Sequence, residues 1–163
     1  PRPHIAILTH GPSAEPAVGD LWEIHSSELV RFATLLVGRS DAPDIVSSAF
    51  ERLTTVPTDT IVLPRAFLFR AVRNEAINVI RQRSRRQARE FAAAVAAESA
   101  IPSNDSDVVR AVAGLSLQQR TVVYFAYWED LTEPQIAEVL AVSPGTVRRQ
   151  LARARSRLRK ELS

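Results

Sequence analysis

The most strongly basic stretch of the chain is residues 143–160, SPGTVRRQLARARSRLRK, which holds six arginines and one lysine and no acidic residue. Guanidinium groups bind phosphate oxygens bidentately, and arginine and glutamine also fit the edges of guanine and adenine. At about 100° per residue, one side of a helix here is apolar; it carries Val147, Leu151, Ala154 and Leu158. The opposite side and its flanks carry Thr146, Arg148, Arg149, Gln150, Arg153, Ser156 and Lys160. A solvated helix normally balances its arginines with acidic neighbours, so we predict that this helix binds DNA.

A second basic stretch, residues 65–89, holds eight arginines against Glu75 alone. As a helix it has an apolar side made of Leu68, Phe69, Val72, Ala76, Val79 and Ile80. Its opposite side carries a polar stripe of Arg70, Asn74, Asn78, Arg81 and Arg85, with Phe67 expected to be exposed at the N-terminal end. Arginine, asparagine and an aromatic ring on one face suit backbone phosphates and unstacked bases. Asparagine is also a poor helix former, which favours a functional stripe over an incidental one.

Charge is segregated along the whole chain, although the net charge is only +3. Residues 1–64 hold four arginines against eight acids, and residues 90–143 hold two arginines against eight acids. The two basic stretches alternate with these acidic ones, which is typical of a protein that binds a polyanion. The use of arginine in place of lysine, twenty to one, does not explain this clustering.

Several classes of protein are disfavoured by composition. The chain has no cysteine, so disulfides, thiolate metal sites and a cysteine nucleophile are excluded. His4, His10 and His25 lie far from the basic stretches, and no phosphate-binding glycine loop is present. No apolar run approaches ~18 residues. We therefore expect no enzyme, no cofactor, no metal site and no membrane span, and a cytoplasmic location.

Helical periodicity dominates from residue 20 onward, and no strand pattern or hairpin signal is present. The helix signals include Gly38 as a C-terminal cap, Pro43 and Pro64 in first turns, and Ser116 as an N-cap. We predict an all-α fold of two small helical domains, residues 20–91 and 108–163. Residues 92–107, rich in Pro, Ser, Asn and Asp toward their end, are the predicted linker, and residues 1–19 remain unassigned.

Two short helices near the C-terminus have the pattern of a helix-turn-helix. Thr132 and Gln135 have the spacing of a capping box, and after a break Ser143 can cap a second helix with Pro144 in its first turn. The second helix is the basic one, as in DNA-binding motifs of this kind. Its N-terminal outward residues, Thr146, Arg149, Gln150 and Arg153, would meet base edges, while the arginines from Arg155 onward suit phosphates.

Three segments together resemble the extracytoplasmic-function type of bacterial RNA polymerase sigma factor. LVGRSDAPDIVSSAFERL and PRAFLFRAVRNEAINVIRQRSRR are similar to consecutive parts of region 2 of that family. LSLQQRTVVYFAYWEDLTEPQIAEVLAVSPGTVRRQLARARSRLR resembles region 4 over nearly its whole length. The resemblance covers about residues 20–163.

The resemblance implies a transcription initiation factor with core RNA polymerase and promoter DNA as partners. Region 2 would bind the polymerase β′ clamp through the helix that contains Asp44 and Phe50. The implied −10 contacts come from the next helix and the loop before it, with Phe67, Arg70, Asn74, Asn78, Arg81 and Arg85. The implied −35 contacts are Ser143, Thr146, Arg148, Arg149, Gln150, Arg153 and Arg157, and region 4 would also contact the β flap. An anti-sigma factor as a further partner is left open.

A transcriptional regulator of the response-regulator type is the alternative interpretation. Its output domain has a very similar helix-turn-helix, and residues 1–104 would then form a sensor or dimerisation domain. A phosphoacceptor domain needs aspartates at strand ends, and the sequence predicts no such strands. The N-terminal half therefore distinguishes the two interpretations.

Overall fold

The structure is a computed structural model that describes residues 17–57, 61–93 and 107–163 of the 163-residue chain. Within these ranges every regular element is a helix and no residue lies in a strand. The predicted all-α fold is confirmed. The predicted extension 1–19 and linker 92–107 lie largely outside the described residues.

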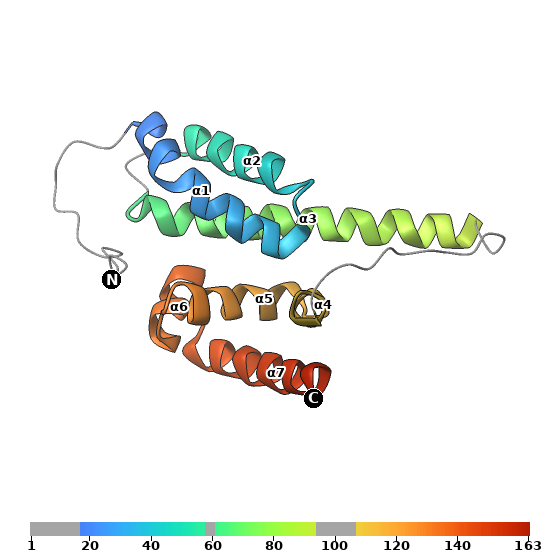
Figure 1. The fold of residues 1–163 in the computed structure, drawn as a ribbon. Coiled ribbons are helices and arrows are strands. Elements are labelled where there is room, and N and C mark those ends of the chain that lie inside the picture. Colours follow the sequence, from blue (N-terminus) through green and yellow to red (C-terminus); the bar gives the residue numbers. More distant parts are fainter. Residues whose placement is uncertain (1–16, 58–60, 94–106) are drawn as a thin grey trace.

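Three helices form the N-terminal half: α1 (Val18–Val37), α2 (Ala42–Thr55) and α3 (Pro64–Ala93). Gly38 ends α1 with a φ of 93°, a value that glycine adopts without steric cost, and its N–H donates to the Thr34 carbonyl. Pro64 begins α3, as predicted from its fixed φ and missing N–H. In Figure 1, α1 and α2 lie along the N-terminal part of α3, and the C-terminal part of α3 projects beyond them.

The C-terminal half consists of α4 (Asp107–Ala113), α5 (Leu117–Val123), a π-helical turn η2 (Tyr124–Trp128), α6 (Glu133–Leu140) and α7 (Pro144–Leu162). Ser116 caps α5, because its Oγ accepts from the Gln119 N–H at 3.2 Å and its own N–H donates to Gln119 Oε1 at 3.0 Å. The sequence predicts one longer helix from this cap. In the structure the α-helical part ends at Val123, and the π-helical turn η2 follows before the chain continues to α6.

The two halves pack against each other, with α1 contacting α5 and α3 contacting α6. Phe32 of α1, Phe69 of α3 and Phe125 of η2 are completely buried. The Phe69 and Phe125 ring centroids lie 5.1 Å apart, and those of Phe32 and Tyr124 lie 4.9 Å apart. One hydrophobic core therefore runs through both halves. The prediction of two small helical domains did not include a core shared between them.

Among the described residues, no helix is long and apolar enough to cross a membrane. The same residues contain no group of three or more His, Asp or Glu side chains that could hold a metal ion. His25 instead hydrogen-bonds Glu28 through Nδ1 at 2.6 Å, while His4 and His10 lie outside the described ranges.

Candidate nucleic-acid interface

The helix-turn-helix forms from local signals at its two helix starts. At α6, the Thr132 N–H donates to Gln135 Oε1 at 2.9 Å, as the capping-box spacing predicts. At α7, the Ser143 Oγ accepts from the Thr146 N–H at 3.2 Å. Between them Ala141 takes a left-handed conformation, with a φ of 54°, which reverses the chain in a very short turn. These signals fix α7 against α6.

The apolar stripe of α7 determines which residues face outward. Val147 and Ala154 are completely buried and Leu151 nearly so, against α5 and α6. Arg149, Arg153 and Arg157 are exposed, whereas Thr146 and Gln150 are half-buried. The predicted division of α7 into a packed face and a basic face is therefore present.

Hydrogen bonds orient several polar residues of α7. Ser143 Oγ and Thr146 Oγ1 lie 2.9 Å apart, and Arg149 Nη2 donates to Thr146 Oγ1 at 3.3 Å. Gln150 Nε2 donates to Gln118 Oε1 of α5 at 3.0 Å. Ser143, Thr146 and Arg149 thus form a connected polar row on the N-terminal turns of α7, where a recognition helix contacts bases.

Arg148 and Arg155 are held by partners within the C-terminal half. Arg148 Nε donates to Glu133 Oε2 at 2.9 Å, so this arginine reaches back to the start of α6. Arg155 Nε donates to Tyr127 Oη at 2.7 Å, with its guanidinium 5.7 Å from the Tyr127 ring centroid. Both arginines remain exposed.

The predicted stripe on α3 is only partly exposed. Asn74, Asn78, Arg81 and Arg85 are exposed, and every residue from 81 to 87 is exposed on the part of α3 that extends past α1. Arg83, on the same segment, pairs with Asp41 and donates to the Val37 carbonyl. This anchor fixes the direction of the basic end of α3.

The N-terminal end of the stripe differs from the sequence prediction. Phe67 is half-buried and packs against the core, so its expected exposure is wrong. Arg70 is also half-buried, and its Nη1 donates to the Val139 carbonyl of α6 at 3.3 Å. The reason is tertiary: α6 packs beside α3 and covers this part of the helix.

The two predicted polymerase-contact residues of α2 lie in different environments. Asp44 is exposed in the first turn of α2. Phe50 is buried, with its ring edge-on to Trp22 at 4.8 Å between centroids. Phe50 therefore holds α1 against α2, and Trp22, which is 42% exposed, presents the aromatic surface at this position.

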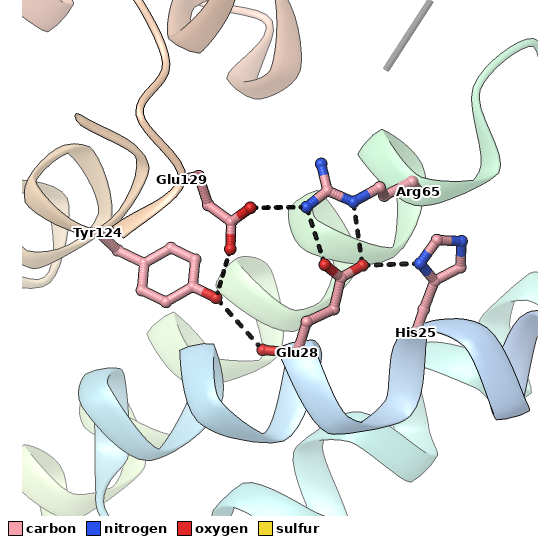
Figure 2. Close-up of polar contacts among 5 residues, drawn as sticks. All are labelled: His25, Glu28, Arg65, Tyr124 and Glu129. Atoms are coloured by element: carbon pink, nitrogen blue, oxygen red, sulfur yellow. Dashed lines mark hydrogen bonds and ion pairs between the residues drawn. The ribbon is translucent and has the colours of Figure 1, made fainter. Parts of the chain in front are cut away.

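A polar cluster between the two halves was not identified from the sequence. Figure 2 shows Arg65 of α3 between Glu28 of α1 and Glu129, which follows η2. Arg65 donates to Glu28 from Nε and Nη2 at 2.9 and 2.8 Å, and Nη2 also lies 3.0 Å from Glu129 Oε2. The Tyr124 hydroxyl donates to Glu129 Oε1 at 3.0 Å. Within the segment YFAYW, Tyr124 and Phe125 are buried, whereas Tyr127 and Trp128 are 58% and 56% exposed, so the segment gives no signal for the contact between Arg65 and Glu129.

The pKa shifts in this cluster show that its charges are well compensated. Burial by itself would raise the pKa of Glu28, but hydrogen bonds from His25 and Arg65 outweigh it and leave the pKa below its ordinary value. Burial would likewise lower the pKa of Arg65, and Glu28 and Glu129 reverse that effect. Burial, with Glu129 nearby, raises the pKa of Tyr124. Glu28 and Arg65 are therefore ionised at neutral pH, and the Tyr124 hydroxyl keeps its proton.

Comparison with known proteins finds a matching family model for each half of the chain. The family model described as Sigma-70 region 2 matches residues 21–86, and the one described as Sigma-70, region 4 matches residues 106–158. The region 2 match occupies the part of the chain that the response-regulator alternative needs for a sensor or dimerisation domain. No curated protein sequence is significantly similar to the chain.

Two solved structures have the same fold over most of their length. One is the sigma factor RpoE from Bartonella quintana in complex with the anti-sigma factor NepR, with a TM-score of 0.65, 21% identity, and coverage of 88% of this chain and 95% of that chain. The other is CnrH in complex with the cytosolic domain of CnrY, with a TM-score of 0.59, 26% identity, and coverage of 90% and 87%. With regions 2 and 4 both present and in this order, the chain belongs to the sigma-70 family and is an RNA polymerase sigma factor of the extracytoplasmic-function type.

Proposed function

We propose that this chain binds core RNA polymerase and directs it to promoters, with region 2 contacting the −10 element and region 4 contacting the −35 element. The observation that carries the proposal is the pairing of two separate basic faces in one chain. One is the outer face of α7, which has no acidic residue before Glu161, and the other is the exposed stripe on α3. A regulator that only binds duplex DNA would not need the second face.

Region 4 reads the −35 element through the N-terminal turns of α7. Ser143 and Thr146 orient Arg149, whose guanidinium can bind a guanine bidentately, and Gln150 can bind an adenine after release from Gln118. Arg153 extends the same exposed face, and Arg148 and Arg157 flank it and bind phosphates. Phosphate contacts set the register, and base contacts give specificity.

Region 2 engages the −10 element as single-stranded DNA along α3. Asn74 and Asn78 can hydrogen-bond base edges, while Arg81 and Arg85 bind the backbone on the projecting part of the helix. Arg70 joins this face only when α6 moves away from it. Phe67, which is half-buried, packs against the core and supports the helix from that side.

The polymerase contacts come from α2 and from region 4. Exposed Asp44 lies in the first turn of α2, which we assign to the β′ clamp, and Trp22, packed on Phe50, adds an aromatic surface further along the same helix. Region 4 contacts the β flap. The protein acts in the cytoplasm as an initiation factor, not as an enzyme. An anti-sigma factor is a fitting partner, because one of the two similar structures is a complex of a sigma factor with an anti-sigma factor.

Transcription by core polymerase on a library of promoter fragments tests this function directly. We expect specific start sites only when the chain is added, and loss of those starts with Arg149→Ala. Arg39→Ala, which removes an exposed arginine of the α1–α2 turn, controls for the loss of one positive charge. Binding to duplex DNA without any effect on core polymerase would contradict the proposal.

A further inference from the structure

Tyr127, in the π-helical turn η2, is a large aromatic residue that lies outside the hydrophobic core. It is exposed, whereas Tyr124 and Phe125 of the same turn are buried. Its side chain contacts α7 instead. Arg155 Nε donates to Tyr127 Oη at 2.7 Å, and the Arg155 guanidinium carbon lies 5.7 Å from the Tyr127 ring centroid. The hydroxyl and the ring of Tyr127 therefore both engage one arginine of α7.

This hydrogen bond occupies only part of the Arg155 guanidinium. A guanidinium carries one Nε–H group and four Nη–H groups, and its planar fork of donors fits phosphate oxygens. The bond to Tyr127 uses Nε, and no hydrogen bond found within the described residues uses the Nη atoms of Arg155. The phenol hydroxyl is also uncharged, so Arg155 keeps its full positive charge. Tyr127 thus holds the arginine without neutralising it.

Arg148 lies on the same flank of α7 but is held by a carboxylate. Positions 148 and 155 are seven residues apart, which places them on one side of the helix and about 10 Å apart along its axis. Arg148 Nε donates to Glu133 Oε2 at 2.9 Å, so Glu133 neutralises this arginine. Among the described residues no carboxylate forms an ion pair with Arg155. A phosphate would have to compete with Glu133 for Arg148, but it meets no such competitor at Arg155.

The flank of α7 that carries Arg155 is where a recognition helix faces the DNA backbone. An α-helix with its side chains is about 10–12 Å wide and the major groove is about 12 Å wide, so the flanks of the helix lie against the two walls of the groove. Arg149 and Arg153 are exposed on the side opposite buried Val147. Arg155 lies about 80° around the helix from Val147, between the packed side and that outer side. This position suits a backbone phosphate better than a base edge.

We propose that Tyr127 is a positioning residue for DNA binding by region 4, because it holds Arg155 with the Nη atoms directed to a backbone phosphate of the −35 duplex. The inference rests on the function proposed above, since it takes α7 to be the helix that enters the −35 duplex. An arginine that is oriented before binding loses less rotamer freedom when the phosphate binds. Arg155 adds one sequence-independent contact to the base contact of Arg149.

Binding of the full chain with core polymerase to a promoter fragment, measured at several salt concentrations, tests this role. Tyr127→Phe removes the hydroxyl and keeps the ring, Arg155→Ala removes the charge, and a double variant combines the two. Arg39→Ala controls for the loss of one exposed positive charge outside region 4. A second fragment, which begins downstream of the −35 element, offers region 4 no −35 duplex. Urea unfolding of each variant shows whether region 4 remains folded.

We expect Arg155→Ala to make the slope of log affinity against log salt concentration shallower by about 0.9, the value for one phosphate contact. Tyr127→Phe should weaken binding about two- to tenfold and keep the wild-type slope, because the charge remains and only its orientation is lost. Tyr127→Phe should cause no further loss in the Arg155→Ala background, since the two residues act through one contact. Both losses should be the same for every −35 base sequence and absent on the shorter fragment. Arg39→Ala should keep the wild-type slope.

A wild-type salt slope for Arg155→Ala would overturn the phosphate contact. Wild-type affinity of Tyr127→Phe, or a loss that persists in the Arg155→Ala background, would overturn the positioning role. Lower urea midpoints with unchanged DNA affinity would show that the pair only supports the fold of region 4. A failure of the proposed function gives a different result, because wild-type chain with core polymerase would then bind the two fragments equally well, and the present inference would fall with it.

Discussion

The sharpest test of the region 4 surface compares two adjacent arginines of α7. Arg149 is exposed and oriented by the Thr146 hydroxyl, whereas Arg148 pairs with Glu133, with side chains 71% and 30% exposed. A bidentate arginine–guanine pair contributes about 1–3 kcal/mol of discrimination, which corresponds to roughly 5- to 150-fold. An exposed ion pair contributes at most about 1 kcal/mol, so the release of Arg148 toward a phosphate changes little. Arg149→Ala should therefore cost much more than Arg148→Ala.

The assay is transcription by core polymerase with the full chain, on one promoter and on variants with each −35 base pair replaced. The Arg149→Ala variant should no longer prefer the original base at one or two base pairs of the −35 element. On templates already altered at those base pairs, the substitution should reduce transcription only a little. Arg149→Lys keeps the charge without the planar fork, so it should retain general affinity but not the base preference. A uniform loss across all templates, wild-type behaviour of Arg149→Lys, or a larger effect of Arg148→Ala would refute the base contact.

Three further predictions concern salt, backbone strain and pH. The log of DNA affinity should fall with the log of salt concentration by a slope of roughly −0.9 per phosphate contacted, and Arg157→Ala should reduce the slope by about one contact; a flat dependence contradicts phosphate binding. Ala141→Gly should raise the free energy of unfolding in urea by about 0.5–1 kcal/mol, because glycine removes the cost of the left-handed conformation, whereas a lower midpoint would disprove that strain. Since the pKa of Glu28 is lowered on folding, its contribution to stability should be fully present above pH 4.5 and be lost as the pH falls through its folded-state value. Glu28→Gln should flatten that part of the pH–stability curve in thermal melts.

Much of the fold follows from signals within a few residues of one another. Gly38, Pro64, Ser116 and Ser143 mark helix ends because their effects on φ, on N–H donors and on capping act within a single turn. The apolar stripe of α7 likewise follows from the 3.6-residue period, so the position of its basic face can be predicted from the order of its residues alone.

Contacts between distant segments could not be predicted in the same way. Arg65 meets Glu28 and Glu129 across 37 and 64 residues, and several other carboxylates in the sequence are equally plausible partners for an arginine. Phe67, Arg70 and Phe50 have the residue types of surface contacts, yet α6 and Trp22 pack against Arg70 and Phe50, and Phe67 packs on the core. Periodicity separates the faces of one helix but does not say which other helix covers each face.

The sequence by itself therefore determined the helix starts and their caps, the helix-turn-helix, and the packed and basic faces of α7, because each depends on interactions along one helix or one turn. Only the tertiary structure decided that regions 2 and 4 share a core, that Glu129 pairs with Arg65, and that α6 covers Arg70. Those features depend on which surfaces meet in space. The free energy of each such contact is a sum over packed rings, ion pairs and desolvated cations, and these are contributed by segments far apart in the chain.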